Sequence, residues 1–177
     1  MPLDPQTLGA RARQAKLLLL DVDGVLTDGR VAISDGGFES KSFFIRDGAA
    51  IVLSERAGLR VALLSGRPSG ATTRRAAELG IRIVVQGGDK REQYERILEQ
   101  TGLTDSEVAY MGDDLLDLPM FARVGLAGAP ADATAEVLAA AHWVSHFGGG
   151  GGAVREFAEL ILREQGHWSR IVAGLST

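Results

Sequence analysis

Residues 17–24 read LLLLDVDG, an uninterrupted apolar run that ends in two aspartates. Four apolar residues in a row, with no polar residue alternating, are typical of a strand buried inside a parallel sheet. The run is far too short to cross a membrane, which takes about 20 apolar residues. We therefore predict a buried strand over residues 16–22 that carries Asp21 and Asp23 to the edge of a sheet.

Around this strand, short apolar runs alternate with helical patterns along the 177 residues. This alternation favours a doubly wound, mainly parallel α/β sheet of the Rossmann-like kind, covered by helices. The predicted strands are 16–22, 59–64, 82–85, 107–111, 124–127 and 142–145. The predicted helices are 4–14, 48–57, 69–79, 90–101, 115–121, 132–140 and 153–165. We expect a single domain over residues 1–177, in which the glycine run 148–152 is a flexible loop.

One segment interrupts the alternation. Residues 30–34 and 38–45 have the pattern of two strands joined by Asp35-Gly36-Gly37, a favourable hairpin turn. We interpret residues 29–46 as a hairpin insertion after the first strand. Because an isolated hairpin is only marginally stable, this apolar insertion must pack either on its own domain or on another subunit.

Charge and cysteine content narrow the class of protein. The chain has 19 basic and 23 acidic residues, a net charge of −4, whereas nucleic-acid-binding surfaces are usually basic. Cysteine is absent, which excludes disulfides and cysteine metal sites and favours a cytoplasmic location. No segment has the pattern of a signal peptide or a membrane span.

Polar groups follow four of the predicted strands, and ligands in open α/β sheets bind beyond the carboxyl ends of strands. Asp21 and Asp23 come first, and a loop that bends at Gly24 would direct both to one site. The alternative is an acidic turn without chemistry. The second strand ends in Ser65-Gly66-Arg67, which can hold a phosphate, although Ser65 could instead cap the next helix.

The third and fourth positions add a cation and more carboxylates. Lys90 can neutralise a phosphate, or it is a solvated lysine at a helix start. Asp113 and Asp114 are adjacent, an arrangement that is costly unless a cation holds them, and oxygen ligands suit Mg²⁺. Asp114 could also cap a helix whose first turn contains Asp117.

In order along the chain, these four sets resemble the motifs of the haloacid dehalogenase superfamily. They read DVDGVLTDG (21–29), LLSGR (63–67), Lys90 and YMGDDLLDLPM (110–120). Two more segments, KSFFIRDGAAI (41–51) and GGGGGAVREFAELIL (148–162), resemble one branch of that superfamily. This branch comprises the 3-deoxy-D-manno-octulosonate 8-phosphate phosphatases and their sialic-acid-phosphate relatives.

The resemblance implies a Mg²⁺-dependent phosphatase that acts through an aspartyl-phosphate. Asp21 would be the nucleophile, and Asp23 would protonate the leaving alcohol and then activate water. Magnesium would be held by the carboxylates of Asp21 and Asp113 and by the Asp23 backbone carbonyl. The residues implied to support the transfer are Ser65 and Lys90 on the phosphoryl oxygens, with Asp114 and Asp117 orienting metal waters or Lys90.

The resemblance also implies an acidic sugar-phosphate substrate and a way to enclose it. About 36 residues separate Asp28 from Ser65, too few for the separate cap domain of many superfamily members. The branch forms homotetramers through the hairpin, with a neighbouring subunit completing each site, and we expect the same here. The implied substrate-binding residues are Arg46, Asp47, Gly48, Gly66, Arg67 and Arg75; a surface position on its helix is the alternative for Arg75.

Three positions depart from the branch pattern. Phe44 stands where Asn or His is common, and Val52 and Gly151 stand where basic residues are usual. A nine-carbon sialic acid phosphate or another small sugar phosphate is therefore an alternative substrate. A receiver-type signalling domain is less favoured, because the acid pair comes late in this chain and not after the first strand. A non-catalytic assembly subunit is less favoured, because every chemical position is intact. A phosphotransferase would need a cap domain to exclude water.

Overall fold

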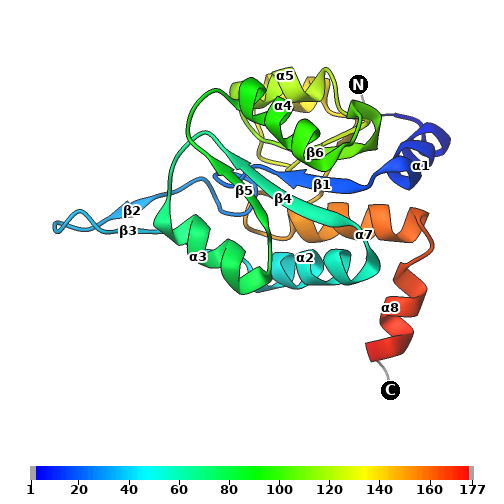
Figure 1. Cartoon of the computed structure of the whole chain (residues 1–177), viewed down its shortest axis with the longest axis horizontal. Coiled ribbons are helices and arrows are strands. Elements are labelled where there is room, and N and C mark those ends of the chain that lie inside the picture. Colours follow the sequence, from blue (N-terminus) through cyan, green and yellow to red (C-terminus); the bar gives the residue numbers. More distant parts are fainter. Residues whose placement is uncertain (1–2, 176–177) are drawn as a thin grey trace.

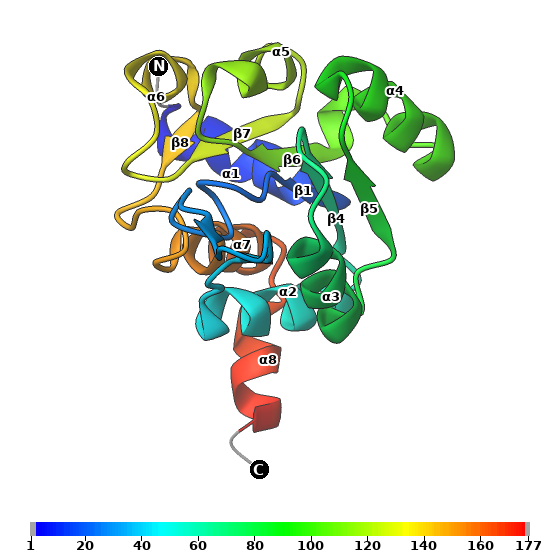
Figure 2. The ribbon, with the colours of Figure 1, turned by 90° about the vertical axis from the view of Figure 1, so that its left-hand side faces the viewer.

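A six-stranded parallel sheet forms the centre of the computed structural model, which describes residues 3–175 (Figures 1 and 2). The strand order is β5-β4-β1-β6-β7-β8, and every neighbouring pair is parallel. The strands are β1 Leu17–Leu20, β4 Arg60–Ser65, β5 Ile83–Gln86, β6 Val108–Met111, β7 Leu126–Ala129 and β8 Trp143–Val144. Because the chain continues to opposite sides of β1, the predicted doubly wound fold is confirmed.

Helices cover both faces of this sheet, as Figure 2 shows along the strands. They are α1 Pro5–Gln14, α2 Ile45–Ala57, α3 Gly70–Leu79, α4 Lys90–Thr101, α5 Leu118–Phe121, α6 Ala135–Ala140, α7 Ala153–Glu164 and α8 Trp168–Leu175. Two short 3₁₀ turns, η1 Asp105–Glu107 and η2 Leu115–Asp117, flank β6. The predicted helix 115–121 is therefore divided between η2 and α5, and α8 was not predicted. No helix within residues 3–175 is both long and apolar enough to span a membrane.

The four leucines of β1 supply both halves of the core. Leu18 and Leu20 pack with α1, α2 and α7 on one face, whereas Leu17 and Leu19 pack with α4, α5 and α6 on the other. All four side chains are fully buried. Successive side chains of a strand point to opposite faces, so an all-leucine strand can occupy only a sheet that is covered on both sides.

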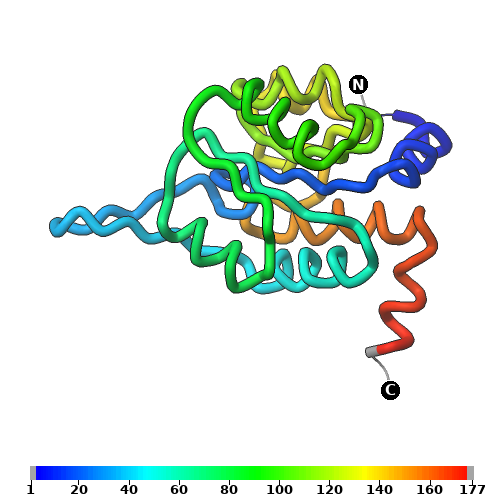
Figure 3. The backbone as a smooth tube through the Cα atoms, in the orientation of Figure 1, coloured from blue at the N-terminus to red at the C-terminus, as the bar shows by residue number. Residues whose placement is uncertain are grey.

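The hairpin is shorter than predicted. Its strands are β2 Ala32–Ile33 and β3 Glu39–Ser40, and α2 begins at Ile45 instead of residue 48. Gly37, with φ +76°, makes the turn, and its N–H donates to the carbonyl oxygen of Ser34 at 2.8 Å. The arm projects from the rest of the subunit (Figure 3). The tip therefore does not fold back onto its own domain, whereas the base of the hairpin does contact it, through Glu39 and Lys41.

The glycine run 148–152 is packed against the loop that follows β1, unlike the flexible loop that we expected. The N–H of Gly150 donates to the carbonyl oxygen of Val25 at 2.9 Å, and the N–H of Gly149 donates to Asp132 Oδ1 at 2.8 Å. A Cβ on Gly149 would lie 1.9 Å from the carbonyl oxygen of Gly24. Only glycine allows the two backbones to approach so closely.

We predict that Gly149→Ala displaces the loop containing Asp23. The expected result is a loss of about 1–3 kcal/mol in the free energy of unfolding, typical of overpacking, together with lower turnover. Gly70→Ala is the matched control, because a Cβ there would meet nothing within 4 Å. Thermal unfolding and turnover of both variants test this, and wild-type behaviour of Gly149→Ala would contradict the packing argument.

Candidate active site

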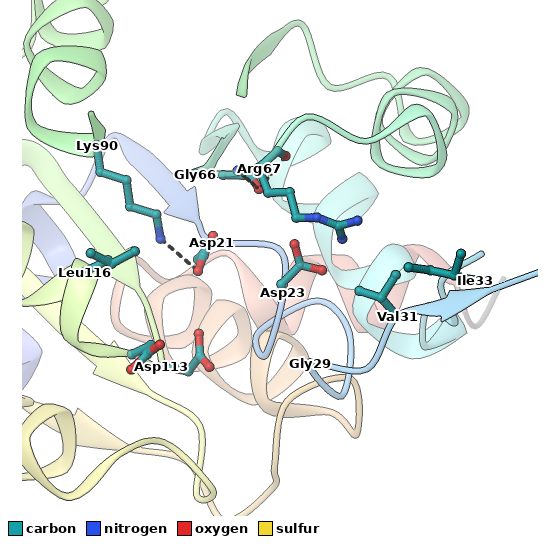
Figure 4. Close-up of a pocket in the computed structure, with 12 residues that line it drawn as sticks. Asp21, Asp23, Gly29, Val31, Ile33, Gly66, Arg67, Lys90, Asp113 and Leu116 are labelled. Atoms are coloured by element: carbon teal, nitrogen blue, oxygen red, sulfur yellow. Dashed lines mark hydrogen bonds and ion pairs between the residues drawn. The ribbon is translucent and has the colours of Figure 1, made fainter. Parts of the chain in front are cut away.

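The carboxyl ends of β1, β4 and β6 meet at one open cavity of about 590 Å³ (Figure 4). It is lined by Asp21, Asp23, Gly29, Val31, Ile33, Ser65, Gly66, Arg67, Lys90, Asp113, Asp114 and Leu116. Parallel strands end at the same edge of a sheet, so groups far apart in the sequence become neighbours there. The cavity thus brings together eight of the residues that the sequence analysis selected, from all four strand-end sets.

A tight turn brings both aspartates of the first set to this cavity. After Asp21 extends the ladder by donating its N–H to the Met111 carbonyl oxygen at 3.0 Å, the chain turns at Gly24, with φ +85°. The carbonyl oxygen of Val22 accepts the N–H groups of Leu26 and Thr27 at 2.9 and 3.1 Å. Asp21 and Asp23 therefore face one site. Because β1 ends at Leu20, the turn and not the alternation of side chains along a strand orients them.

Lys90 lies among carboxylates and is not a solvated lysine. Its ammonium is 2.9 Å from Asp21 Oδ2 and 2.5 Å from Asp117 Oδ1, and the side chain is only 9% exposed. Burial by itself disfavours the charged form, but the carboxylates of Asp21 and Asp117 outweigh it and raise the pKa of Lys90. A fixed positive charge therefore faces the Asp21 carboxylate.

Asp117 organises this corner from a fully buried position. Its Oδ1 accepts hydrogen bonds from Lys90 and from the Tyr110 hydroxyl, the latter at 2.6 Å. Its Oδ2 accepts the backbone N–H groups of Asp113 and Asp114 at 2.9 and 3.1 Å. With four donors, both oxygens of Asp117 are committed to holding Lys90 and the loop after β6.

Two expected helix-cap roles have different outcomes. Asp114 caps η2, because its Oδ1 accepts the N–H of Leu115 at 2.7 Å. Ser65 does not cap α3: that role belongs to Ser69, whose Oγ accepts the N–H of Thr72 at 3.3 Å. Ser65 instead exchanges hydrogen bonds with the backbone of Arg67 at the cavity wall.

The acidic cluster fits a divalent cation. Carboxylate oxygens of Asp21, Asp113 and Asp117 lie within 4.8 Å of one another, and Asp113 Oδ1 is buried without a hydrogen-bond partner. Burial raises the pKa of Asp21 to about 6, against the opposing effect of Lys90. Burial, reinforced by the carboxylates of Asp21 and Asp117, raises the pKa of Asp113 to about 7. Since Asp117 is already satisfied, Asp21 and Asp113 are the side chains left to bind a hard cation such as Mg²⁺.

Four expected substrate-binding residues do not line this cavity: Arg46, Asp47, Gly48 and Arg75. Gly48 and Arg75 line a second, mainly apolar cavity of about 550 Å³ between α2, α3 and α8. Asp47 is buried, and its Oδ1 accepts the N–H of Arg155 at 2.8 Å in the first turn of α7. Burial also raises the pKa of Asp47 to about 6. Asp47 therefore supports the start of α7 and does not line the cavity.

Sequence reasoning missed Lys41 and Glu39. Both come from the second arm of the hairpin, and Lys41 pairs with Asp23 at 2.7 Å. Glu39 accepts a hydrogen bond from Ser69 Oγ at 2.7 Å and pairs with Arg67. A lysine two residues before Phe43 in KSFF was an available signal, but the partner of a hairpin lysine is set by tertiary packing.

Known proteins resemble this chain in both sequence and fold. The model of the haloacid dehalogenase-like hydrolases matches residues 37–125. The 3-deoxy-D-manno-octulosonate 8-phosphate phosphatase of Salmonella typhimurium is 40% identical over 166 residues, covering 93% of this chain and 88% of that protein. The structure of the Yersinia pestis phosphatase of the same name is 41% identical with a TM-score of 0.89, and covers 91% of this chain and 88% of that one.

A third relative contains ligands. The corresponding phosphatase of Moraxella catarrhalis, solved with a magnesium ion, a phosphate ion and a KDO molecule, is 33% identical with a TM-score of 0.94. The similarity covers 97% of this chain and 99% of that one. The match to the family model, the identity over nearly the whole chain and the shared fold agree with the geometry of the cavity. The chain therefore belongs to the haloacid dehalogenase-like hydrolases and is a phosphatase.

Proposed function

We propose that this phosphatase hydrolyses 3-deoxy-D-manno-octulosonate 8-phosphate to the free sugar acid and inorganic phosphate. One observation carries the proposal: Asp21, Asp23, Lys90 and Asp113 converge on a single open cavity. The identity with phosphatases of that name over most of the chain supports the choice of substrate. An interpretation as a receiver domain is wrong, because the chain belongs to a different family.

In the proposed reaction, a carboxylate oxygen of Asp21 attacks phosphorus in line with the departing sugar oxygen. The P–O bond to the sugar breaks as the bond to Asp21 forms, and Asp23 gives its proton to the leaving alcohol. Asp23 then takes a proton from a water molecule that attacks the aspartyl-phosphate and releases phosphate.

The other residues of the cavity hold charge. Lys90 and Ser65 would bind the transferring phosphoryl oxygens, a role supported by their position in the cavity wall. Asp117 would keep Lys90 in place through their ion pair. Mg²⁺, bound by the carboxylates of Asp21 and Asp113 and the backbone carbonyl of Asp23, would offset the repulsion between phosphate and nucleophile. Gly24 lets the Asp113 carboxylate lie against the loop that carries Asp23, since a Cβ on Gly24 would lie 2.0 Å from Asp113 Oδ2.

Three residues favour keeping a second candidate substrate, a nine-carbon sialic acid phosphate or another small sugar phosphate. Val52 lines the second cavity with an apolar side chain, and a Cβ built on Gly152 would lie 3.7 Å from the Phe44 ring. Gly151 has no side chain to reach a sugar. Each position lacks the polar group that is usual in the branch, so contacts to the sugar differ while the phosphate chemistry is retained.

We also propose a homotetramer assembled through the hairpins. The cavity is open, and Val31 and Ile33 of the hairpin wall only one side of it. Ile33 is 69% exposed and Phe38 is 79% exposed, so a single subunit leaves these apolar side chains in contact with solvent. Packed against neighbours, the hairpins would become buried.

The oligomer proposal predicts a mass near four times the 18.7 kDa of one chain, measured by sedimentation equilibrium. Phe38→Asp places a charge on the apolar hairpin tip and should shift the protein to smaller species without unfolding it, because the tip is outside the core. A wild-type monomer at assay concentration would contradict the proposal.

The substrate proposal predicts phosphate release that is greatest for 3-deoxy-D-manno-octulosonate 8-phosphate in a panel with sialic acid 9-phosphates and hexose phosphates. Chelation of Mg²⁺ should abolish it. Asp21→Asn is the background control and should lose activity by more than about 10³-fold while remaining folded, as for loss of a nucleophile. Preference for another sugar would reject the substrate, and full activity of Asp21→Asn would reject the chemistry.

The raised pKa values predict how metal binding depends on pH. A cation binds carboxylates in their deprotonated form, so protons compete with Mg²⁺ once the pH falls below about 7, the pKa of Asp113. One displaced proton weakens Mg²⁺ binding about tenfold per pH unit, and a steeper fall follows when Asp21 is protonated near pH 6. Calorimetric titration with Mg²⁺ at several pH values tests this, and an affinity that does not change between about pH 5 and 8 would contradict it.

A further inference from the structure

Lys41 is a buried cation beside the active site that the proposed chemistry does not use. It follows β3 at the base of the hairpin, and its side chain is 0% exposed. The ammonium donates a hydrogen bond to Asp23 Oδ2 at 2.9 Å and lies 2.7 Å from Oδ1 as an ion pair. Lys41 does not line the cavity, whereas Lys90 does. Its charge is therefore directed at Asp23 and not at the substrate.

Glu39 joins this pair to the loop after β4. Its Oε1 lies 3.8 Å from the Lys41 ammonium and accepts the hydrogen bond from Ser69 Oγ. Its Oε2 pairs with Arg67, which lines the cavity. The base of the hairpin thus connects the carboxyl group of Asp23 with the segment that carries Arg67 and Ser69.

Asp23 depends on this anchor. Within residues 3–175, Lys41 supplies the only hydrogen bond and ion pair that the Asp23 carboxyl group makes. A carboxyl group that moves a proton must lie within hydrogen-bond reach of the leaving oxygen, so freedom of rotation would reduce transfer. In turn, a fully buried ammonium needs a charged partner, and Glu39, 3.8 Å away, supplies one when Asp23 carries the proton. The two residues therefore hold each other.

We propose that Lys41 is a positioning residue that fixes the Asp23 carboxyl group for proton transfer to the leaving alcohol. The inference rests on the proposed role of Asp23 in phosphate ester hydrolysis. Because Lys41 acts through Asp23, its loss must matter most for substrates whose leaving group needs a proton. A sugar alkoxide needs one, whereas nitrophenolate leaves as a stable anion.

The test compares Lys41→Met with wild type on two substrates, 3-deoxy-D-manno-octulosonate 8-phosphate and p-nitrophenyl phosphate. We expect kcat for the sugar ester to fall about 10²-fold, in the range of general acid catalysis, with KM little changed. The fall for the nitrophenyl ester should be at least about tenfold smaller. Equal losses on both esters would overturn the proposal, because misfolding or a purely structural role affects both alike.

Two further measurements make the result specific. In an Asp23→Asn background, Lys41→Met should cause no additional loss on the sugar ester, since residues that act together are not additive. An additional loss of the full size would overturn the proposal. Lys16→Met is the matched control, because this lysine is 63% exposed and pairs with Glu107 away from the cavity; it should behave as wild type.

If Lys41→Met fails to fold, Lys41→Gln takes its place with the same two outcomes. The assays also separate this inference from the proposed substrate. If the wild type hydrolyses p-nitrophenyl phosphate but not the octulosonate ester, the substrate proposal fails. The leaving-group comparison is then made with whichever alkyl phosphate in the sugar panel is hydrolysed, and the same ratio decides the role of Lys41.

Discussion

The parallel pairing of β1 with β4 on one side and β6 on the other is the constraint on which the rest of the molecule depends. It buries both faces of the leucine strand and aligns three carboxyl ends at one edge of the sheet. Because β1 is central, the residues that follow it receive groups from both sides. Asp21 thus meets Lys90 after β5, on the β4 side, and Asp113 after β6.

This convergence concentrates charge in a poorly solvated place. Burial raises the pKa values of Asp21 and Asp113, and the unpartnered Oδ1 of Asp113 shows that the protein alone does not satisfy the cluster. Lys90 compensates for part of the negative charge, while Asp117 is used entirely for support. A site of this kind is arranged to bind a cation and a phosphate together, since each offsets the charge that the other brings.

Two segments outside the sheet hold the loop between Asp21 and Asp28. The glycine run packs against it from one direction, through Gly149 and Gly150. The hairpin base holds it from another, through Lys41. Catalytic carboxyl groups on a loop need such support because a strand end by itself leaves their side chains free to rotate. The hairpin therefore contributes to the site of its own subunit, in addition to its proposed part in assembly.

The sequence by itself determined the fold class, most of the strands and eight of the twelve residues that line the central cavity. Strand burial, helix-ending glycines and polar strand ends are local patterns, and each follows from hydrophobicity or backbone geometry over a few residues. Gly58, Gly80 and Gly102 all end helices in the left-handed conformation. Boundaries such as the start of α2 were less accurate, because the local patterns of hairpin and helix overlap at Ile45.

Only the tertiary structure decided how these residues are used. It assigned Asp117 to support, turned Asp47 toward α7, and paired Lys41 with Asp23 across 18 positions of sequence. The physical reason is that burial and ion pairing depend on which surfaces meet, and no local pattern records the partner of a charged side chain. A run of apolar residues predicts that a strand is buried, but folding alone determines which residue lies beside a buried charge.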